Sequence, residues 1–219
     1  MDRIFARQWL SVLAMCTSSC SLVSQPPDFG DPDARVWLGD SAPVPPNCLP
    51  ARTGEVVFNE VLAKPAGVDL DGDGLSISRD EAIELIYAGS QPGHLQGATL
   101  WLGDKQRGLI SDGACLQPGQ LVVLTGSKTG PVVVQPQARH IWLGHPLELR
   151  DSGATLRLQG VLGTDLGELT YPQAMPSQSW VRQTDGDAAA ALVGHPPYSG
   201  GQHSIGWRLP APSGATAGN

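Results

Sequence analysis

The chain has 219 residues and a formal net charge of −7, with 14 Lys and Arg residues against 21 Asp and Glu residues. No cluster of Lys or Arg occurs in it, which argues against nucleic acid or an anionic membrane surface as an electrostatic partner. Glycine (27 residues) and proline (19 residues) are frequent and only 16% of the residues are charged, so we expect many strands joined by tight turns. The length leaves room for one folded domain of roughly 150 residues.

The N-terminus has the features of a secretory signal. Arg3 and Arg7 supply positive charge, residues 9–15 form an apolar region too short to span a bilayer, and small residues lead to Cys20. A cysteine in this setting, followed by a polar proline-rich stretch, resembles the lipobox of bacterial lipoproteins and implies that Cys20 is lipidated. Ser21 follows it, and in Gram-negative lipoproteins a residue other than Asp there usually means the outer membrane. Secretion without an anchor is the alternative.

Two cysteines remain downstream of this signal, Cys48 and Cys115. Export would place them in an oxidising compartment, where disulfides form and persist. We therefore predict a disulfide between Cys48 and Cys115. The alternative is two buried or partly buried free thiols.

The central part of the chain has no sustained helical periodicity, and short apolar runs alternate there with turn residues. This pattern predicts an all-β sandwich or barrel. The run 55–63 is not cleanly amphipathic, which predicts a mostly buried strand. We expect strands at 55–63, 81–88, 99–102, 121–125, 132–134, 140–143, 147–150, 155–158, 168–171 and 179–182.

The order of seven short motifs is the most specific pattern in the sequence. It comprises an Asn-Glu strand, an acidic insertion, an Ile-Glu-Leu strand, a Leu-Gln-Gly turn, a Pro-Gly turn, a Leu-Arg-Asp-Ser-Gly segment and a Ser-Trp-Val-Arg strand, at 55–61, 69–74, 80–85, 95–100, 116–120, 147–153 and 179–182. This order resembles the lamin-tail domain in its bacterial, exported form. The resemblance implies an immunoglobulin-like β-sandwich that is usually non-catalytic and that occurs in surface proteins or beside secreted hydrolases. We expect a signal peptide at 1–19, a proline-rich tether at 20–47, the lamin-tail-like domain at 48–209 and a disordered tail at 210–219.

An acidic loop at 69–80 is the one segment that resembles a site. Its carboxylates stand at loop positions 1, 3, 5 and 12, with Gly74 at position 6, which is the spacing at which a chain can curl round Ca²⁺. Several unpaired carboxylates so close together would repel one another unless a cation lay between them. The predicted ligands of a structural calcium ion are Asp69, Asp71, Asp73, the backbone carbonyl of Leu75, Asp80, and Glu81 as a substitute for Asp80. The alternative is a solvated Asp/Gly turn.

Catalytic patterns are weak in this sequence. The five histidines are scattered without a short metal-ligand spacing, and no Gly-x-Ser-x-Gly elbow follows a strand. Glu60, Glu81 and Glu84 could approach one another on paired strands as an acid/base pair, although such residues more often lie at a strand edge or pair with a basic neighbour. We therefore expect no enzyme.

The sequence favours an exported, surface-tethered or secreted immunoglobulin-like module that binds an extracellular or envelope protein or glycan. It would touch a membrane only through a lipid anchor. One rival is a small secreted hydrolase that uses the carboxylates of the acidic loop with a bound cation. The other is a passive envelope spacer or assembly protein that pairs through an exposed sheet edge.

Overall fold

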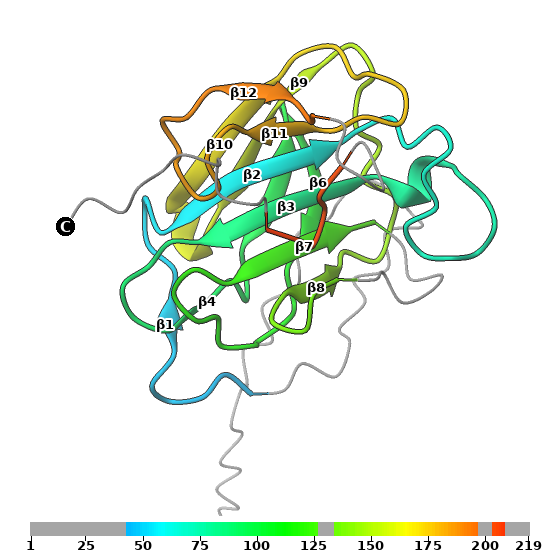
Figure 1. The fold of residues 1–219 in the computed structure, drawn as a ribbon. Helices are drawn as coiled ribbons and strands as arrows, with labels where there is room; N and C mark the ends of the chain where they lie inside the picture. Colours follow the sequence, from blue (N-terminus) through cyan, green and yellow to red (C-terminus); the bar gives the residue numbers. More distant parts are fainter. Residues whose placement is uncertain (1–42, 127–133, 197–202, 209–219) are drawn as a thin grey trace, which may run out of the picture. The chain divides into compact units, whose positions relative to one another are not determined.

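The computed structural model of the chain describes residues 43–126, 134–196 and 203–208, all of which belong to one compact unit spanning Arg35–Asn219 (Figure 1). No α-helix occurs within these described ranges, and so none that is long and apolar enough to cross a membrane. The all-β class is confirmed. The elements are β1 (Leu49–Pro50), β2 (Val56–Leu62), η1 (Ser78–Asp80), β3 (Ala82–Tyr87), β4 (Gly93–His94), β5 (Thr99–Leu102), β6 (Lys105–Leu109), β7 (Leu121–Thr125), β8 (Arg139–Trp142), β9 (Ala154–Gln159), η2 (Val161–Gly163), β10 (Asp165–Tyr171), β11 (Trp180–Arg182) and β12 (Leu192–Gly194), where η marks a 3-10 turn.

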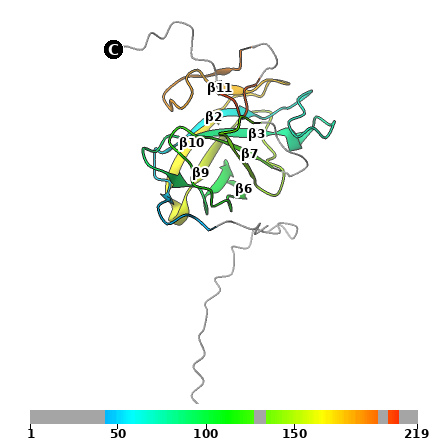
Figure 2. The same ribbon diagram turned by 60° about the horizontal axis from the view of Figure 1, so that its bottom comes forward.

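Two sheets form a sandwich of the immunoglobulin-like kind. One has six strands in the order β12-β11-β2-β3-β7-β8, the other has four in the order β10-β9-β5-β6, and β1 and β4 form a small parallel pair. Figure 2 shows β2, β3 and β7 in one layer and β6 and β9 in the other. All pairings within the two large sheets are antiparallel except that of β7 with β8. One continuous core joins the layers, built from side chains such as Val61, Ile83, Leu85, Val122 and Leu124 of the larger sheet and Leu100, Leu102, Leu156, Leu158 and Leu169 of the smaller one.

The two central strands, β2 and β3, are buried on both faces. Every residue of both strands is buried, which confirms the prediction that 55–63 would be a mostly buried strand. Side chains alternate between the two faces of a strand, so burial of all of them requires a cover on the outer face as well. A second apolar cluster supplies part of that cover, where Ile205 packs on Leu62, Ala82 and Val123. The segment near the C-terminus therefore acts as a third layer over part of the six-stranded sheet.

The segment 147–150 was predicted as a strand, and that prediction is wrong. Its backbone has no ladder partner. The N–H of Leu149 donates to the Glu81 carboxylate at 3.0 Å, and Arg150 exchanges hydrogen bonds with the Tyr171 hydroxyl through its N–H (2.9 Å) and its carbonyl (3.2 Å). Glu148 has φ of +50°, which breaks the extended conformation. The alternating Leu147 and Leu149 are buried as a strand pattern predicts, but side chains take the place of a neighbouring strand.

Other differences are smaller. The expected strand at 132–134 falls largely outside the described residues, and Val134 lies in a loop. The short strands β1, β4 and β12 were not predicted. The polar strand β6 was not predicted either, because only Leu109 in it is a large apolar residue; it pairs with β5 as the edge of the smaller sheet. The remaining expected strands all form, with their ends shifted by at most a few residues.

The predicted disulfide is confirmed. Cys48 and Cys115 are bonded, with their Cα atoms 5.7 Å apart and a sequence separation of 67. The bond ties the chain just before β1 to the segment that carries Leu116, whose backbone exchanges hydrogen bonds with Gly93 of β4. A disulfide persists in an oxidising compartment, so the bond indicates that the protein is exported.

Reduction of this disulfide should destabilise the fold. Closing a loop of this length restricts the unfolded chain by about 4 kcal/mol in the chain-entropy model. We expect the variant Cys48→Ser/Cys115→Ser to lose about 2–4 kcal/mol of unfolding free energy in urea titrations, and dithiothreitol to have the same effect on the parent protein. An unfolding curve that does not change on reduction would contradict the structural role of the bond.

Candidate metal centre

The acidic loop connects β2 to β3 and is fixed at its base by hydrogen bonds. The Ser76 hydroxyl donates to the Val68 carbonyl at 2.9 Å and accepts from the N–H of Gly67 at 2.7 Å. The Ser177 hydroxyl donates to the Ala66 carbonyl from the segment before β11. The short turn η1 then leads the chain into β3. Figure 1 shows the loop projecting from the ends of these two strands.

The first carboxylate of the loop, Asp69, organises the turn that follows it. Its Oδ1 accepts from the N–H groups of Gly72 (2.7 Å) and Asp73 (3.2 Å), and its Oδ2 accepts from Gly74 (2.9 Å). Gly72 and Gly74 have φ of +71° and +83°, a conformation that costs a glycine little. The chain therefore curls back towards Asp69, as the glycine at loop position 6 predicts.

Three carboxylates meet inside this curl. Ligand oxygens of Asp69, Asp71 and Asp73 all lie within 4.8 Å of one another. Among the described residues no other group of three or more His, Cys, Asp or Glu side chains converges in this way. The acidic cluster could hold a metal ion, and its oxygen ligands alone do not select calcium.

Asp71 is the least compensated member of the cluster. Its side chain is 7% exposed, its Oδ1 accepts only from the N–H of Asp73 at 3.2 Å, and its buried Oδ2 has no hydrogen-bond partner in the described structure. Burial raises the pKa of this carboxyl, and the charges of Asp73, Asp80 and Asp69 raise it further, while the bond from Asp73 lowers it. A buried oxygen without a partner costs about 1–3 kcal/mol, more when it is charged, and a cation would remove that cost.

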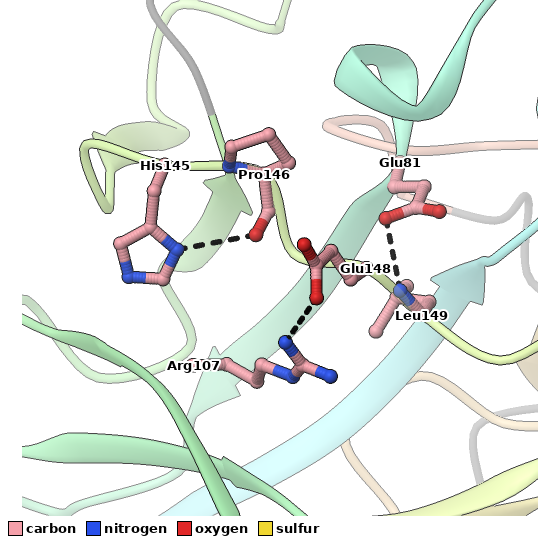
Figure 3. A network of polar contacts seen from close by, with 6 residues as sticks. All are labelled: Glu81, Arg107, His145, Pro146, Glu148 and Leu149. Atoms are coloured by element: carbon pink, nitrogen blue, oxygen red, sulfur yellow. Dashed lines mark hydrogen bonds and ion pairs between the residues drawn. The ribbon is translucent and has the colours of Figure 1, made fainter. Parts of the chain in front are cut away.

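Asp80 and Glu81 lie outside this group. Both Asp80 oxygens are used by loop backbone, Oδ1 accepting from Leu70 at 2.8 Å and Oδ2 from Ile77 at 2.9 Å, and the side chain is only 1% exposed. The Glu81 carboxylate accepts instead from Leu149, on the segment where Arg107 pairs with Glu148 (Figure 3). Burial raises the pKa of Glu81 to about 7.

Leu75, the fourth predicted ligand residue, lies beside the cluster, since its N–H donates to Asp73 Oδ1 at 2.8 Å. The predicted lipidation site, Cys20, lies outside the described residues. The same is true of residues 1–19, most of the tether at 20–47 and the tail at 210–219. The structure thus brings together three of the six predicted ligand residues and places a fourth next to them.

The most buried carboxylates belong to Glu60 and Glu84, which sequence reasoning treated only as surface or catalytic candidates. They are directly opposite each other in the β2–β3 register, and both have 0% exposure. Neither lies at a sheet edge, and no Lys or Arg of the described residues bonds to either, so the expectation of an edge position or a basic partner is wrong. Two glutamates in predominantly apolar strands are the sequence signal for such a pair, but the strand register had to be known.

Comparison with models of known protein families gives no match for this chain, and a search of curated proteins gives none either. Its function is therefore inferred from the fold and from these residues.

Removal of the Asp80 side chain should destabilise the loop by the same amount whether or not a metal is present. Asp80→Ala removes the acceptor of two partly buried hydrogen bonds, those donated by the N–H groups of Leu70 and Ile77, and a hydrogen bond to a charged group contributes about 1.5–3 kcal/mol. We expect a loss of about 2–4 kcal/mol in urea unfolding, equal in EDTA and in calcium. Asp80→Asn keeps one acceptor oxygen and should lose less. A loss that appears only in calcium would show instead that Asp80 is a metal ligand.

Proposed function

We propose that this protein is an exported, non-catalytic module of the lamin-tail-like class, tethered by a lipid on Cys20 or secreted, whose β2–β3 loop is ordered by one calcium ion. The module binds or supports another component outside the cytoplasm, an extracellular or envelope protein or a glycan. The observation that carries the calcium site is the buried, unpartnered Oδ2 of Asp71 within a group of three carboxylates.

The chemistry of the ligands supports calcium. Every ligand atom in the group is a carboxylate oxygen, the donor type that hard cations prefer. Calcium accepts six to eight oxygens in irregular geometry, whereas magnesium requires a nearly ideal octahedron and gives up its water reluctantly. A short loop that supplies three carboxylates, with the Leu75 carbonyl and water beside them, suits the larger ion. Calcium affinity depends on the number of charged ligands and on the rigidity of the site. With three carboxylates in a flexible loop we expect the weak affinity of extracellular calcium-binding domains, with a Kd of about 10⁻⁴–10⁻³ M.

The non-catalytic assignment is supported by the character of the acidic residues. Within the described residues, the buried carboxylates other than that of Asp71 belong to Glu60, Asp80, Glu81 and Glu84. All four accept hydrogen bonds from other parts of the fold. They are therefore engaged in holding segments of the chain together.

Calorimetric titration of the purified protein with Ca²⁺ tests the proposed ion. We expect a single site and an increase in melting temperature, because a ligand at about 100 times its Kd stabilises the folded state by about 2.7 kcal/mol. Asp71→Asn should abolish both effects. The matched control is Asp104→Asn, the same change at an exposed residue of the β5–β6 turn, which should titrate like the parent. No heat and no stabilisation at millimolar calcium would overturn the calcium site.

The rival hydrolase is tested on the same variants. A panel of esterase, nuclease and glycosidase substrates should remain uncut with or without calcium. Turnover that Asp71→Ala abolishes would replace the binding module with an enzyme. Mass spectrometry of the protein from its native envelope decides between a lipidated Cys20 and plain secretion, and affinity capture from that envelope separates a binding module from a passive spacer.

A further inference from the structure

The described segment His203–Arg208, called the strap below, crosses the outer face of the six-stranded sheet. Figure 1 shows it in red across β3 and β7. Ile205 is 1% exposed and packs on the apolar side chains Leu62, Ala82 and Val123. The Gly206 carbonyl accepts from the N–H of Gln135 at 3.0 Å, and the Arg208 guanidinium donates to the Gly119 carbonyl. These contacts are few for a segment that covers two central strands.

The buried glutamates supply the strap's remaining polar anchors. Glu60 accepts from the N–H of Ser204 at 2.8 Å and from its hydroxyl at 2.5 Å, and also from the Ser179 hydroxyl at 2.5 Å. Glu84 accepts from the N–H of Gly206 at 2.7 Å and from the Asn59 amide at 2.8 Å. Each glutamate therefore holds one end of the short turn 204–206 onto the sheet.

Two carboxylates that face each other without water cannot both carry a charge at low cost. Burial raises the pKa of Glu60 to about 7, and burial together with the charge of Glu60 raises the pKa of Glu84 well above its usual value. The titrations are coupled, so the proton belongs to the pair. The closed pair therefore holds a proton more tightly than either glutamate would in the open chain.

The surrounding groups do not supply a compensating positive charge. Asp185 adds a further carboxylate, which accepts from the Asn59 amide at 3.1 Å. Burial lowers the pKa of both His195 and His203, so both imidazoles are uncharged above pH 7. Arg182 on β11 donates to the carbonyls of Phe58 and Ala190. The strand β7 places Val123 opposite Glu84, and Arg208 of the strap is exposed.

We propose that Glu60 and Glu84 form a proton-dependent clasp, which keeps the strap closed while the pair holds its proton and loosens it as the pH rises and the second carboxyl ionises. Opening lets water reach both carboxylates, so the pKa of each glutamate returns to its ordinary value. The proton held by the pair is then released to solvent. Opening also uncovers the apolar patch of Leu62, Ala82 and Val123. The proposal is independent of the acidic loop and of any metal there.

The direction of the pH dependence follows from the raised pKa values. A group whose pKa is higher in the closed state stabilises that state fully below its ordinary pKa of about 4.5 and loses the contribution as the pH rises through the raised value. The clasp should therefore weaken as the pH rises. Opening also exposes His203, whose pKa burial lowers from 6.5, and its protonation opposes this trend at lower pH, so the loss is clearest between about pH 6.5 and pH 8.

Amide hydrogen exchange on the full chain measures the clasp directly. After correction for the pH dependence of intrinsic exchange, protection of the Ser204 and Gly206 amides should fall by up to about tenfold per pH unit across that range, because one proton is released on opening. Amides of β9, which lies between β10 and β5 in the other sheet, should keep their protection. Protection of Ser204 and Gly206 that stays constant relative to β9 would refute the clasp.

A charge-neutral variant identifies the groups. Glu84→Gln imitates the protonated acid, so its Gly206 amide should remain protected at pH 8 and lose most of the pH dependence. Glu168→Gln, the same change at an exposed residue of β10, should keep the dependence of the parent. An unchanged slope in Glu84→Gln would overturn the assignment. If that variant does not fold, as judged from its β9 amides, the profile of the parent chain still decides the proposal.

Discussion

A buried carboxylate loses its hydration, and hydrogen-bond donors, an opposite charge or a proton must compensate for that loss. The β2–β3 hairpin and its loop bury five carboxylates, those of Glu60, Asp71, Asp80, Glu81 and Glu84. None of the ion pairs among the described residues involves any of them. How each one is compensated determines the shape of the hairpin and of the segments that pack on it.

The five differ in what compensates them. Backbone N–H groups of the loop satisfy both oxygens of Asp80, and Glu81 pins the irregular segment before β9 through Leu149. Glu60 and Glu84 accept hydrogen bonds from the strap. Asp71 has one long hydrogen bond and one bare oxygen. It is the one of the five whose compensation is incomplete, and the cation of the proposed function would complete it.

The sequence predicted the elements better than their contacts. Apolar runs bounded by Gly, Pro and Asp locate most strands, and the only pair of cysteines downstream of the predicted signal peptide predicts the disulfide. The strand predicted at 147–150 does not form, because alternating apolar residues indicate only which side chains are buried. A strand also needs the backbone of a neighbouring strand, and here the hydrogen-bond partners are the side chains of Glu81 and Tyr171. The spacing of the acidic residues in the loop correctly predicted that the carboxylates of Asp69, Asp71 and Asp73 converge. It could not show that Asp80 and Glu81 bond elsewhere, nor that Glu60 faces Glu84, because strand register across a long loop is set by tertiary packing.

A cation beside Asp71 would be seen in a crystal structure grown in millimolar calcium, with anomalous diffraction data. We expect an anomalous peak about 2.3–2.6 Å from Asp71 Oδ2, within reach of Asp69 and Asp73 oxygens. Density for water alone at that oxygen, or a loop in which Asp71 turns out to solvent, would show that no cation compensates this carboxylate.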